Sequence, residues 1–207
     1  MPAEKSKIGI LAIQGDFAAH AAILHSLGAE TLEVRTITDL KECEALILPG
    51  GESTTQLQFL QEEGLFEAIK KFAEDQHAIF GTCAGAILLA TTVKNPPQDA
   101  LGLLDMTVLR NAYGRQLASD VFFGPTKLKP QPMEMVFIRA PIIDQVGPGV
   151  EVLAEYAGKP ALVRQGSVLA ATFHPELTSD PTVHRYFLNL VNSHSAQGEP
   201  LAAHSGK

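Results

Sequence analysis

The chain is poor in cysteine, with only Cys43 and Cys83 among its 207 residues. Two thiols are too few for the disulfide framework of a secreted domain, and they have no clustered histidines with which to form a structural zinc site. We therefore expect no metal, a structural role for Cys43 and a reduced, reactive Cys83. Six histidines show no metal-ligand spacing and are predicted to be surface or helix-face residues: His20, His25, His77, His184, His194 and His204.

Long apolar runs and an excess of positive charge are also missing. No run approaches the roughly 18 apolar residues of a membrane span, and residues 1–6 lack the apolar core of a signal peptide. Lys and Arg number 16 against 23 Asp and Glu, for a net charge of −7, which argues against binding a phosphate backbone. We expect a soluble, cytoplasmic protein with no nucleic-acid or membrane partner.

What the chain does contain indicates an α/β fold. Hydrophobic residues make up 45% of it, enough for the core of one domain. Short apolar runs at 7–13, 30–35 and 44–48 have the character of buried strands, and apolar stripes at helical spacing lie between and after them, around Leu24 and Ile69. Strands that alternate with helices predict a mostly parallel central sheet covered on both faces.

The second half of the chain is richer in strand-like segments, which Pro and Gly separate. We expect antiparallel strands added to the sheet here, at residues 106–109, 133–138, 150–156, 161–164 and 168–172. A final helix follows, capped by Ser179 or Asp180, with its buried face at Val183, Tyr186, Phe187, Leu190 and Val191. Periodicity is then lost, so residues 1–194 are predicted to form a single domain and residues 195–207 a disordered tail.

The most informative segment is Gly81-Thr82-Cys83-Ala84-Gly85. It follows the apolar run 78–80 and precedes the helix-like run 86–90, which places a cysteine in a sharp strand-to-helix turn. The glycines permit a strained turn, and the helix N-terminus directs backbone N–H groups at the sulfur, which favours the thiolate. The alternative is a buried cysteine that behaves as a small hydrophobe.

Two further segments carry polar groups at strand ends. His174 and Glu176 follow the strand at 168–173, and two residues apart in extended chain they project to the same side, so that the carboxylate can orient the imidazole. The alternative is a strand-end histidine beside a solvated glutamate. Ligands of open α/β sheets gather at the carboxyl ends of strands, where Cys83 is also expected, and this favours a nucleophile, base and acid set.

A glycine-rich loop, Pro-Gly-Gly-Glu-Ser-Thr-Thr at 49–55, precedes a helix that Ser53 or Thr54 is placed to cap. Its open N–H groups suit an anion or a developing oxyanion, although a tight βα turn explains the same residues. Arg110 and Arg139 end two β-rich stretches and are suited to clamp a carboxylate, or are solvated surface arginines.

Taken together, these segments resemble the class I (triad) glutamine amidotransferases, and most closely the glutaminase subunits of pyridoxal 5′-phosphate synthase. The resemblance runs from about residue 8 to 192. Its most specific segments are Ile-Gln-Gly at 13–15, Gly-Gly-Glu-Ser-Thr-Thr at 50–55, Leu-Arg-Asn-Ala-Tyr-Gly-Arg-Gln at 109–116, Phe-Ile-Arg-Ala-Pro at 137–141 and Phe-His-Pro-Glu-Leu-Thr at 173–178. Ile87 stands where many other class I enzymes carry glutamine, and Tyr113 stands where phenylalanine is frequent.

The resemblance implies a flavodoxin-like three-layer sandwich that hydrolyses L-glutamine to glutamate and ammonia without a cofactor. It implies a triad of Cys83, His174 and Glu176, with an oxyanion hole formed by Gly50, Gly51 and Ala84. The glutamine contacts that it implies are Gly51, Glu52, Ser53, Arg110, Ile138 and Arg139.

The resemblance also implies a partner. In the family, a (β/α)8-barrel synthase subunit receives the ammonia, joins it to a pentose phosphate and a triose phosphate, and forms a large hetero-oligomer with the glutaminase. Two alternatives stay open. One is a glutaminase of another pathway, such as histidine biosynthesis, and the other is a stress-response protein of the same fold without glutaminase activity.

Overall fold

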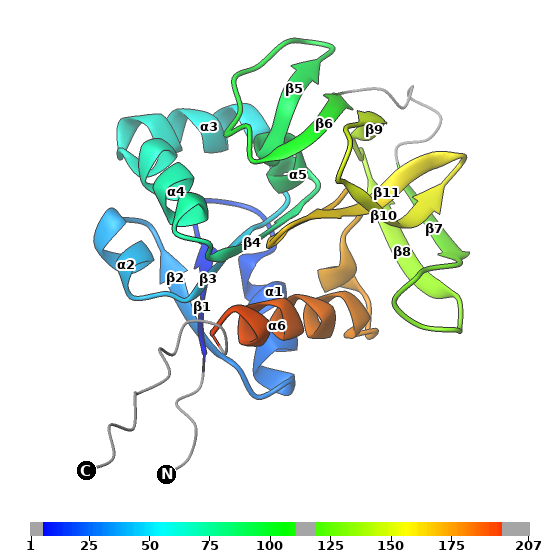
Figure 1. Ribbon diagram of the computed structural model, residues 1–207, viewed down its shortest axis with the longest axis horizontal. Coiled ribbons are helices and arrows are strands. Elements are labelled where there is room, and N and C mark those ends of the chain that lie inside the picture. Colours follow the sequence, from blue (N-terminus) through cyan, green and yellow to red (C-terminus); the bar gives the residue numbers. More distant parts are fainter. Residues whose placement is uncertain (1–5, 111–118, 196–207) are drawn as a thin grey trace, which may run out of the picture.

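The computed structural model describes residues 6–110 and 119–195 (Figure 1). At its centre is a seven-stranded sheet with the order β10-β11-β12-β4-β3-β1-β2. Its parallel strands are β1 (Lys7–Leu11), β2 (Glu30–Val34), β3 (Ala45–Leu48), β4 (Ala78–Thr82) and β12 (Val168–Ala171). Two antiparallel strands extend it beyond β12, namely β11 (Lys159–Gln165) and β10 (Glu151–Tyr156).

The expected antiparallel additions are therefore confirmed for β10 and β11 but not for the other segments. The last segment, β12, pairs in parallel with β4 and is antiparallel to β11 alone. Two small sheets form apart from the main one, a three-stranded sheet β5-β6-β9 and a hairpin of β7 with β8. Their bounds are β5 (Ala90–Lys94), β6 (Leu104–Leu109), β7 (Ser119–Gly124), β8 (Met133–Ile138) and β9 (Ile142–Val146).

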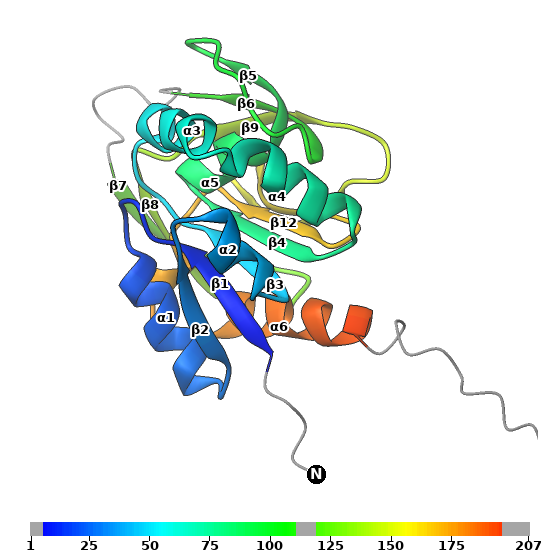
Figure 2. The ribbon, with the colours of Figure 1, turned by 90° about the vertical axis from the view of Figure 1, so that its left-hand side faces the viewer.

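Helices cover both faces of the sheet, as the strand–helix alternation predicts (Figures 1 and 2). One face packs against α1 (Phe17–Ser26) and α6 (Thr182–Ser195). The opposite face packs against α2 (Ile37–Lys41), α3 (Ser53–Glu62), α4 (Leu65–Glu74) and α5 (Ala84–Leu89). The result is a three-layer α/β sandwich.

Alternation along the central strands explains why the molecule has two cores. In β4, Ile79 faces the core under α2–α5, whereas Phe80 faces the core under α1 and α6. Both are fully buried. A strand covered on both sides exposes neither set of side chains, so it is apolar throughout rather than alternately polar. This is the sequence pattern from which the parallel strands were predicted.

The helix predictions hold at their buried faces. Leu24 of α1 and Leu65 and Ile69 of α4 are fully buried. The final helix begins where expected, because Asp180 accepts a hydrogen bond from the backbone N–H of Thr182 at 3.1 Å. The predicted tail starts at the last residue of α6, and its remainder, 196–207, lies outside the described residues. That residues 1–194 form one domain stays a prediction. No helix of the described part is long and apolar enough to cross a bilayer.

Candidate active site

Cys83 occupies a strained turn between β4 and α5, with φ of 48° and ψ of −101°. Its N–H donates to the carbonyl of Ala171 at 2.8 Å, which ties the turn to β12. The flanking glycines are required by close contacts: a Cβ on Gly81 would lie 2.6 Å from the Gly85 carbonyl, and one on Gly85 would lie 1.9 Å from the Leu48 carbonyl oxygen. The strand–turn–helix predicted around Cys83 is therefore the observed local structure.

His174 meets Cys83 from the end of β12. The backbone N–H of His174 donates to Val136 of β8 at 2.8 Å, and its ring and the Cys83 side chain both lie against Gly50. Burial lowers the pKa of His174, but the hydrogen bonds and charges of Cys83 and Glu176 outweigh it and raise that pKa to about 10. The imidazole is thus held as a cation beside the sulfur, which is the state that supports a thiolate nucleophile.

Glu176 orients this imidazole. Its Oε1 lies 2.8 Å from Nδ1 of His174, and its side chain is fully buried. The contact was predicted, but the predicted extended chain is wrong, because residues Pro175–Leu177 form a 3-10 turn. The turn carries Glu176 back toward the histidine that precedes it. Cys83, His174 and Glu176 are therefore brought together in the order that a cysteine-based triad needs.

The glycine-rich loop lies against the same pair. A Cβ on Gly50 would fall 2.4 Å from Cε1 of His174 and 3.5 Å from Cβ of Cys83, so this position admits no side chain. Gly51 has φ of 142°, which a side chain would strain. Because the loop backbone lies this close to Cys83, its N–H groups can approach the sulfur. Such an arrangement suits an oxyanion site.

The helix after the loop is capped differently from our prediction. Glu52, not Ser53 or Thr54, is the N-cap of α3, and its carboxylate accepts from the N–H groups of Thr54 and Thr55 at 3.1 and 2.8 Å. Desolvation raises the pKa of Glu52, but these hydrogen bonds outweigh it and lower that pKa overall. The buried Ser53 hydroxyl instead donates to Gln98 at 3.1 Å.

Three residues that fix this loop were not singled out as site residues. Gly15, with φ of 87°, lies so close to the Gly50 carbonyl that a Cβ there would fall 1.8 Å from its oxygen. Gln14 donates to the Glu52 carbonyl at 3.1 Å. Buried Gln56 donates to the Gly50 carbonyl at 3.2 Å. The segment at 13–15 was noted in the resemblance, whereas Gln56 gives no signal beyond its place in a helix.

The predicted substrate contacts are divided between two sides of Cys83. Arg110 reaches the loop, donating to the Thr54 hydroxyl at 2.9 Å and lying 3.4 Å from a Glu52 oxygen. Its neighbours 111–118 lie outside the described residues, including Tyr113. On the other side, the Ile138 carbonyl is 3.9 Å from Sγ of Cys83, and exposed Arg139 follows it with φ of 45°.

Two histidines predicted to be surface or helix-face residues lie on helix faces that are buried behind the triad. His20 of α1 and His184 of α6 are both fully buried, and their rings contact Phe80 edge-on. Nδ1 of His20 is 2.9 Å from Nε2 of His184, and Nε2 of His20 is 3.4 Å from Oε2 of Glu176. His25 is exposed as predicted.

Cys43 differs sharply from Cys83. Burial raises the pKa of the Cys43 thiol to about 11, and its Sγ donates to the Asp39 carbonyl at 3.2 Å. A thiol in this state is protonated at neutral pH and is not nucleophilic. The structural role predicted for Cys43 agrees with this environment.

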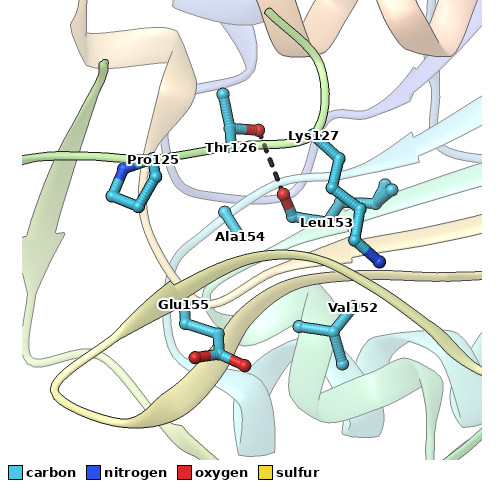
Figure 3. A pocket seen from close by; sticks show the side chains of 7 residues that line it. All are labelled: Pro125, Thr126, Lys127, Val152, Leu153, Ala154 and Glu155. Atoms are coloured by element: carbon cyan, nitrogen blue, oxygen red, sulfur yellow. Dashed lines mark hydrogen bonds between the residues drawn. The ribbon is translucent and has the colours of Figure 1, made fainter. Parts of the chain in front are cut away.

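A pocket of about 330 Å³ lies elsewhere, on the edge strand β10 (Figure 3). It is lined by Pro125, Thr126, Lys127, Val152, Leu153, Ala154 and Glu155. Two strands, β11 and β12, separate β10 from β4, which ends at Cys83. Near the triad, Asp16, His174 and Glu176 each place one oxygen or nitrogen within 4.8 Å of the others. A cation held there would compete with the bond between His174 and Glu176.

Comparison with known proteins places this geometry in a family. The model of the SNO glutamine amidotransferase family matches residues 10–193. A pyridoxal 5′-phosphate synthase subunit PdxT from Koribacter versatilis is 55% identical over 187 residues, covering 90% of this chain and 96% of the relative. A PdxT from Thermotoga maritima is 48% identical over 186 residues, covering 89% and 99%.

Solved structures of glutamine amidotransferases also resemble this chain. A crystal structure of a glutamine amidotransferase superposes with a TM-score of 0.84 at 48% identity, covering 89% of this chain and 98% of that one. A putative GMP synthase protein from Thermoplasma acidophilum is 18% identical with a TM-score of 0.70, covering 95% and 99%, and it supports the fold alone.

Fold and matches together define a flavodoxin-like sandwich of the class I glutamine amidotransferase type. Within that class, the chain belongs to the SNO glutamine amidotransferase family.

Proposed function

We propose that this chain is the glutaminase subunit of a pyridoxal 5′-phosphate synthase. The observation that carries the proposal is the juxtaposition of Cys83, His174 and Glu176, in a chain that is 55% identical to a PdxT subunit. The substrate is L-glutamine and the products are L-glutamate and ammonia. No cofactor takes part, and the protein acts in the cytoplasm.

The reaction begins with attack of the Cys83 thiolate on the side-chain carboxamide carbon of glutamine. The oxygen becomes an oxyanion, which backbone N–H groups of Gly50, Gly51 and Ala84 stabilise. His174 then gives its proton to the nitrogen, ammonia leaves, and a thioester remains on the sulfur. Water that gives its proton to His174 hydrolyses the thioester to glutamate and restores the thiolate.

Glutamine is held on both sides of the sulfur. We assign its α-carboxylate to the arginines, Arg110 beside the glycine loop and Arg139 after β8, because guanidinium groups suit carboxylates. The remaining contacts come from Gly51, Glu52 and Ser53 on the loop side and from Ile138 on the other side. The carbonyl of Ile138, 3.9 Å from the sulfur, is close enough to the reacting atoms to accept from the carboxamide nitrogen.

The ammonia requires a receiver. In water near neutral pH it is largely protonated and loses its nucleophilicity, so its release is useful only beside a second active site. We propose that a (β/α)8-barrel synthase subunit receives it in a large hetero-oligomer and uses it to make pyridoxal 5′-phosphate from a pentose phosphate and a triose phosphate.

The test measures glutamate released from glutamine with and without the barrel subunit. We expect the partner to raise the rate, Cys83→Ala to abolish it, and Cys43→Ala to leave it unchanged, because the buried Cys43 thiol is inert. An activity that Cys83→Ala removes but the partner leaves unchanged would indicate another pathway, such as histidine biosynthesis. No hydrolysis with the partner present would refute the proposal and favour a stress protein of the same fold.

A further inference from the structure

A pair of buried histidines lies directly behind Glu176. His20 comes from α1 and His184 from α6, and both are fully buried. Nε2 of His20 lies 3.4 Å from Oε2 of Glu176 and 3.2 Å from the hydroxyl of Thr82, the last residue of β4. Nδ1 of His20 lies 2.9 Å from Nε2 of His184. The reaction described above uses neither ring.

Glu176 needs a donor on this side. Its side chain is fully buried, and Oε1 already accepts from His174 at 2.8 Å. Among the described residues, Oε2 makes no hydrogen bond of ordinary geometry. A buried carboxylate oxygen without a donor is costly, and Nε2 of His20 is placed to supply one.

The direction of the hydrogen bonds follows from the charge of the two rings. Burial and the neighbouring His184 hold the pKa of His20 well below its usual range, and burial lowers the pKa of His184 to about 4. Each ring is therefore neutral near pH 7 and carries a single N–H. If His20 carried it on Nδ1, the lone pair of Nε2 would face the carboxylate. With the N–H on Nε2, His20 directs it at two neighbouring acceptors, Oε2 of Glu176 at 3.4 Å and the Thr82 hydroxyl at 3.2 Å, while Nδ1 accepts from His184.

We propose that His20 is a positioning residue of the triad: its Nε2–H holds Oε2 of Glu176, and His184 fixes the tautomer by donating to Nδ1. His184 of α6 then donates to His20 of α1, and His20 donates to Oε2 of Glu176. His174 contacts the other carboxylate oxygen, Oε1. The proposal rests on the proposed function only for the roles of Cys83 and His174.

Other charged groups around the carboxylate do not replace this donor. Asp16, at the start of α1, brings an oxygen within 4.8 Å of His174 and Glu176, but it is an acceptor of the same charge as Glu176. Nδ1 of His174 is already bonded to the other carboxylate oxygen, Oε1 of Glu176, at 2.8 Å. A loosened carboxylate would orient His174 less well and stabilise its positive charge less, so that His174 would support a thiolate at Cys83 less well.

The test compares His20→Gln with His20→Asn, because the Gln amide reaches the position of Nε2 and the Asn amide does not. His25→Gln, on the exposed side of α1, is the control. The readout is the rate at which iodoacetamide alkylates Cys83 as a function of pH, followed by mass spectrometry of the peptide that contains Cys83. No glutamine is needed.

We expect His20→Asn to move the midpoint of this profile up by about one pH unit and to slow alkylation roughly tenfold at pH values below the midpoint of the unmodified chain. His20→Gln and His25→Gln should stay within about threefold of the unmodified chain. In glutaminase assays, His20→Asn should lower kcat with little change in KM. A merely structural role would lower thermal stability without moving the midpoint.

Equal midpoints for His20→Asn and the unmodified chain would overturn the proposal. If His20→Asn does not fold, His184→Leu takes its place, because it removes the donor to Nδ1 while His184→Gln keeps one; equal midpoints for these two would also overturn it. A chain that hydrolyses no glutamine but shows the shifted midpoint would refute the proposed function and retain this inference.

Discussion

Acid should destabilise this protein through its two buried histidines, and the effect of His184 can be worked out. Burial lowers the pKa of His184 to about 4 in the folded chain, whereas an unfolded histidine has a pKa near 6.5. The unfolded state therefore binds more protons below pH 6.5. The stability that His184 contributes is fully present above that pH and is lost as the pH falls toward about 4.

The size of the loss follows from the two pKa values. On going from about pH 7 to about pH 5, His184 alone lowers the free energy of unfolding by about 2 kcal/mol, and its limiting loss below pH 4 is about 3 kcal/mol. The pKa of His20 is also lowered, first by burial, so His20 acts in the same direction. The free energy of unfolding of a typical domain is about 5–15 kcal/mol, so the loss from His184 is a substantial fraction of it.

Urea unfolding near pH 7 and near pH 5 measures how the free energy of unfolding depends on pH in the unmodified chain, His184→Gln and His25→Gln. In His184→Gln, a non-titrating amide can still donate to His20, and the pH dependence should shrink by about 2 kcal/mol. His25→Gln, which alters an exposed histidine of α1, should keep the full dependence. The carboxylates and His174 are present in all three proteins, so their contributions to the pH dependence cancel when the proteins are compared. An unchanged pH dependence in His184→Gln would refute the assignment of a neutral buried ring.

Two further predictions concern the turn at Cys83 and the substrate contacts. Gly85→Ala would place a Cβ 1.9 Å from the Leu48 carbonyl oxygen and should lower the free energy of unfolding by about 3 kcal/mol, and a urea midpoint like that of the unmodified chain would refute this. Arg110→Met should raise KM for glutamine roughly tenfold with a smaller effect on kcat, because it removes a charged donor beside the loop. An unchanged KM in steady-state assays would remove Arg110 from the glutamine site.

The parts of the site that the sequence predicts are those that local chemistry determines. The glycines around Cys83 mark a turn that no other residue fits, and the apolar run before it marks a buried strand. His174 and Glu176 are two residues apart, so their contact requires only a short turn. Our error there concerned the backbone, because an extended chain and a 3-10 turn both bring these side chains together.

The parts that the sequence does not reveal depend on contacts between distant segments. His20 and His184 are separated by 164 positions and meet only because α1 and α6 pack on the same face of the sheet. In a helical pattern, a histidine at a buried position looks like any other helix-face residue. Gln56 is similar, since its bond to the Gly50 carbonyl depends on how α3 leaves the loop. The two small sheets were missed because strand-like segments do not specify their partners.

The buried histidines have an energetic cost that packing does not explain. Apolar side chains of similar volume beside Phe80 would fill the same space, would not titrate, and would avoid the loss of stability in acid. They would also leave Oε2 of Glu176 facing hydrocarbon, without a donor on that side. A carboxylate fixed at one oxygen alone orients the imidazole of His174 less firmly. Acid sensitivity and an ordered triad therefore both result from the contacts of His20 and His184. His184→Gln measures the acid sensitivity, and His20→Asn measures the ordering of the triad.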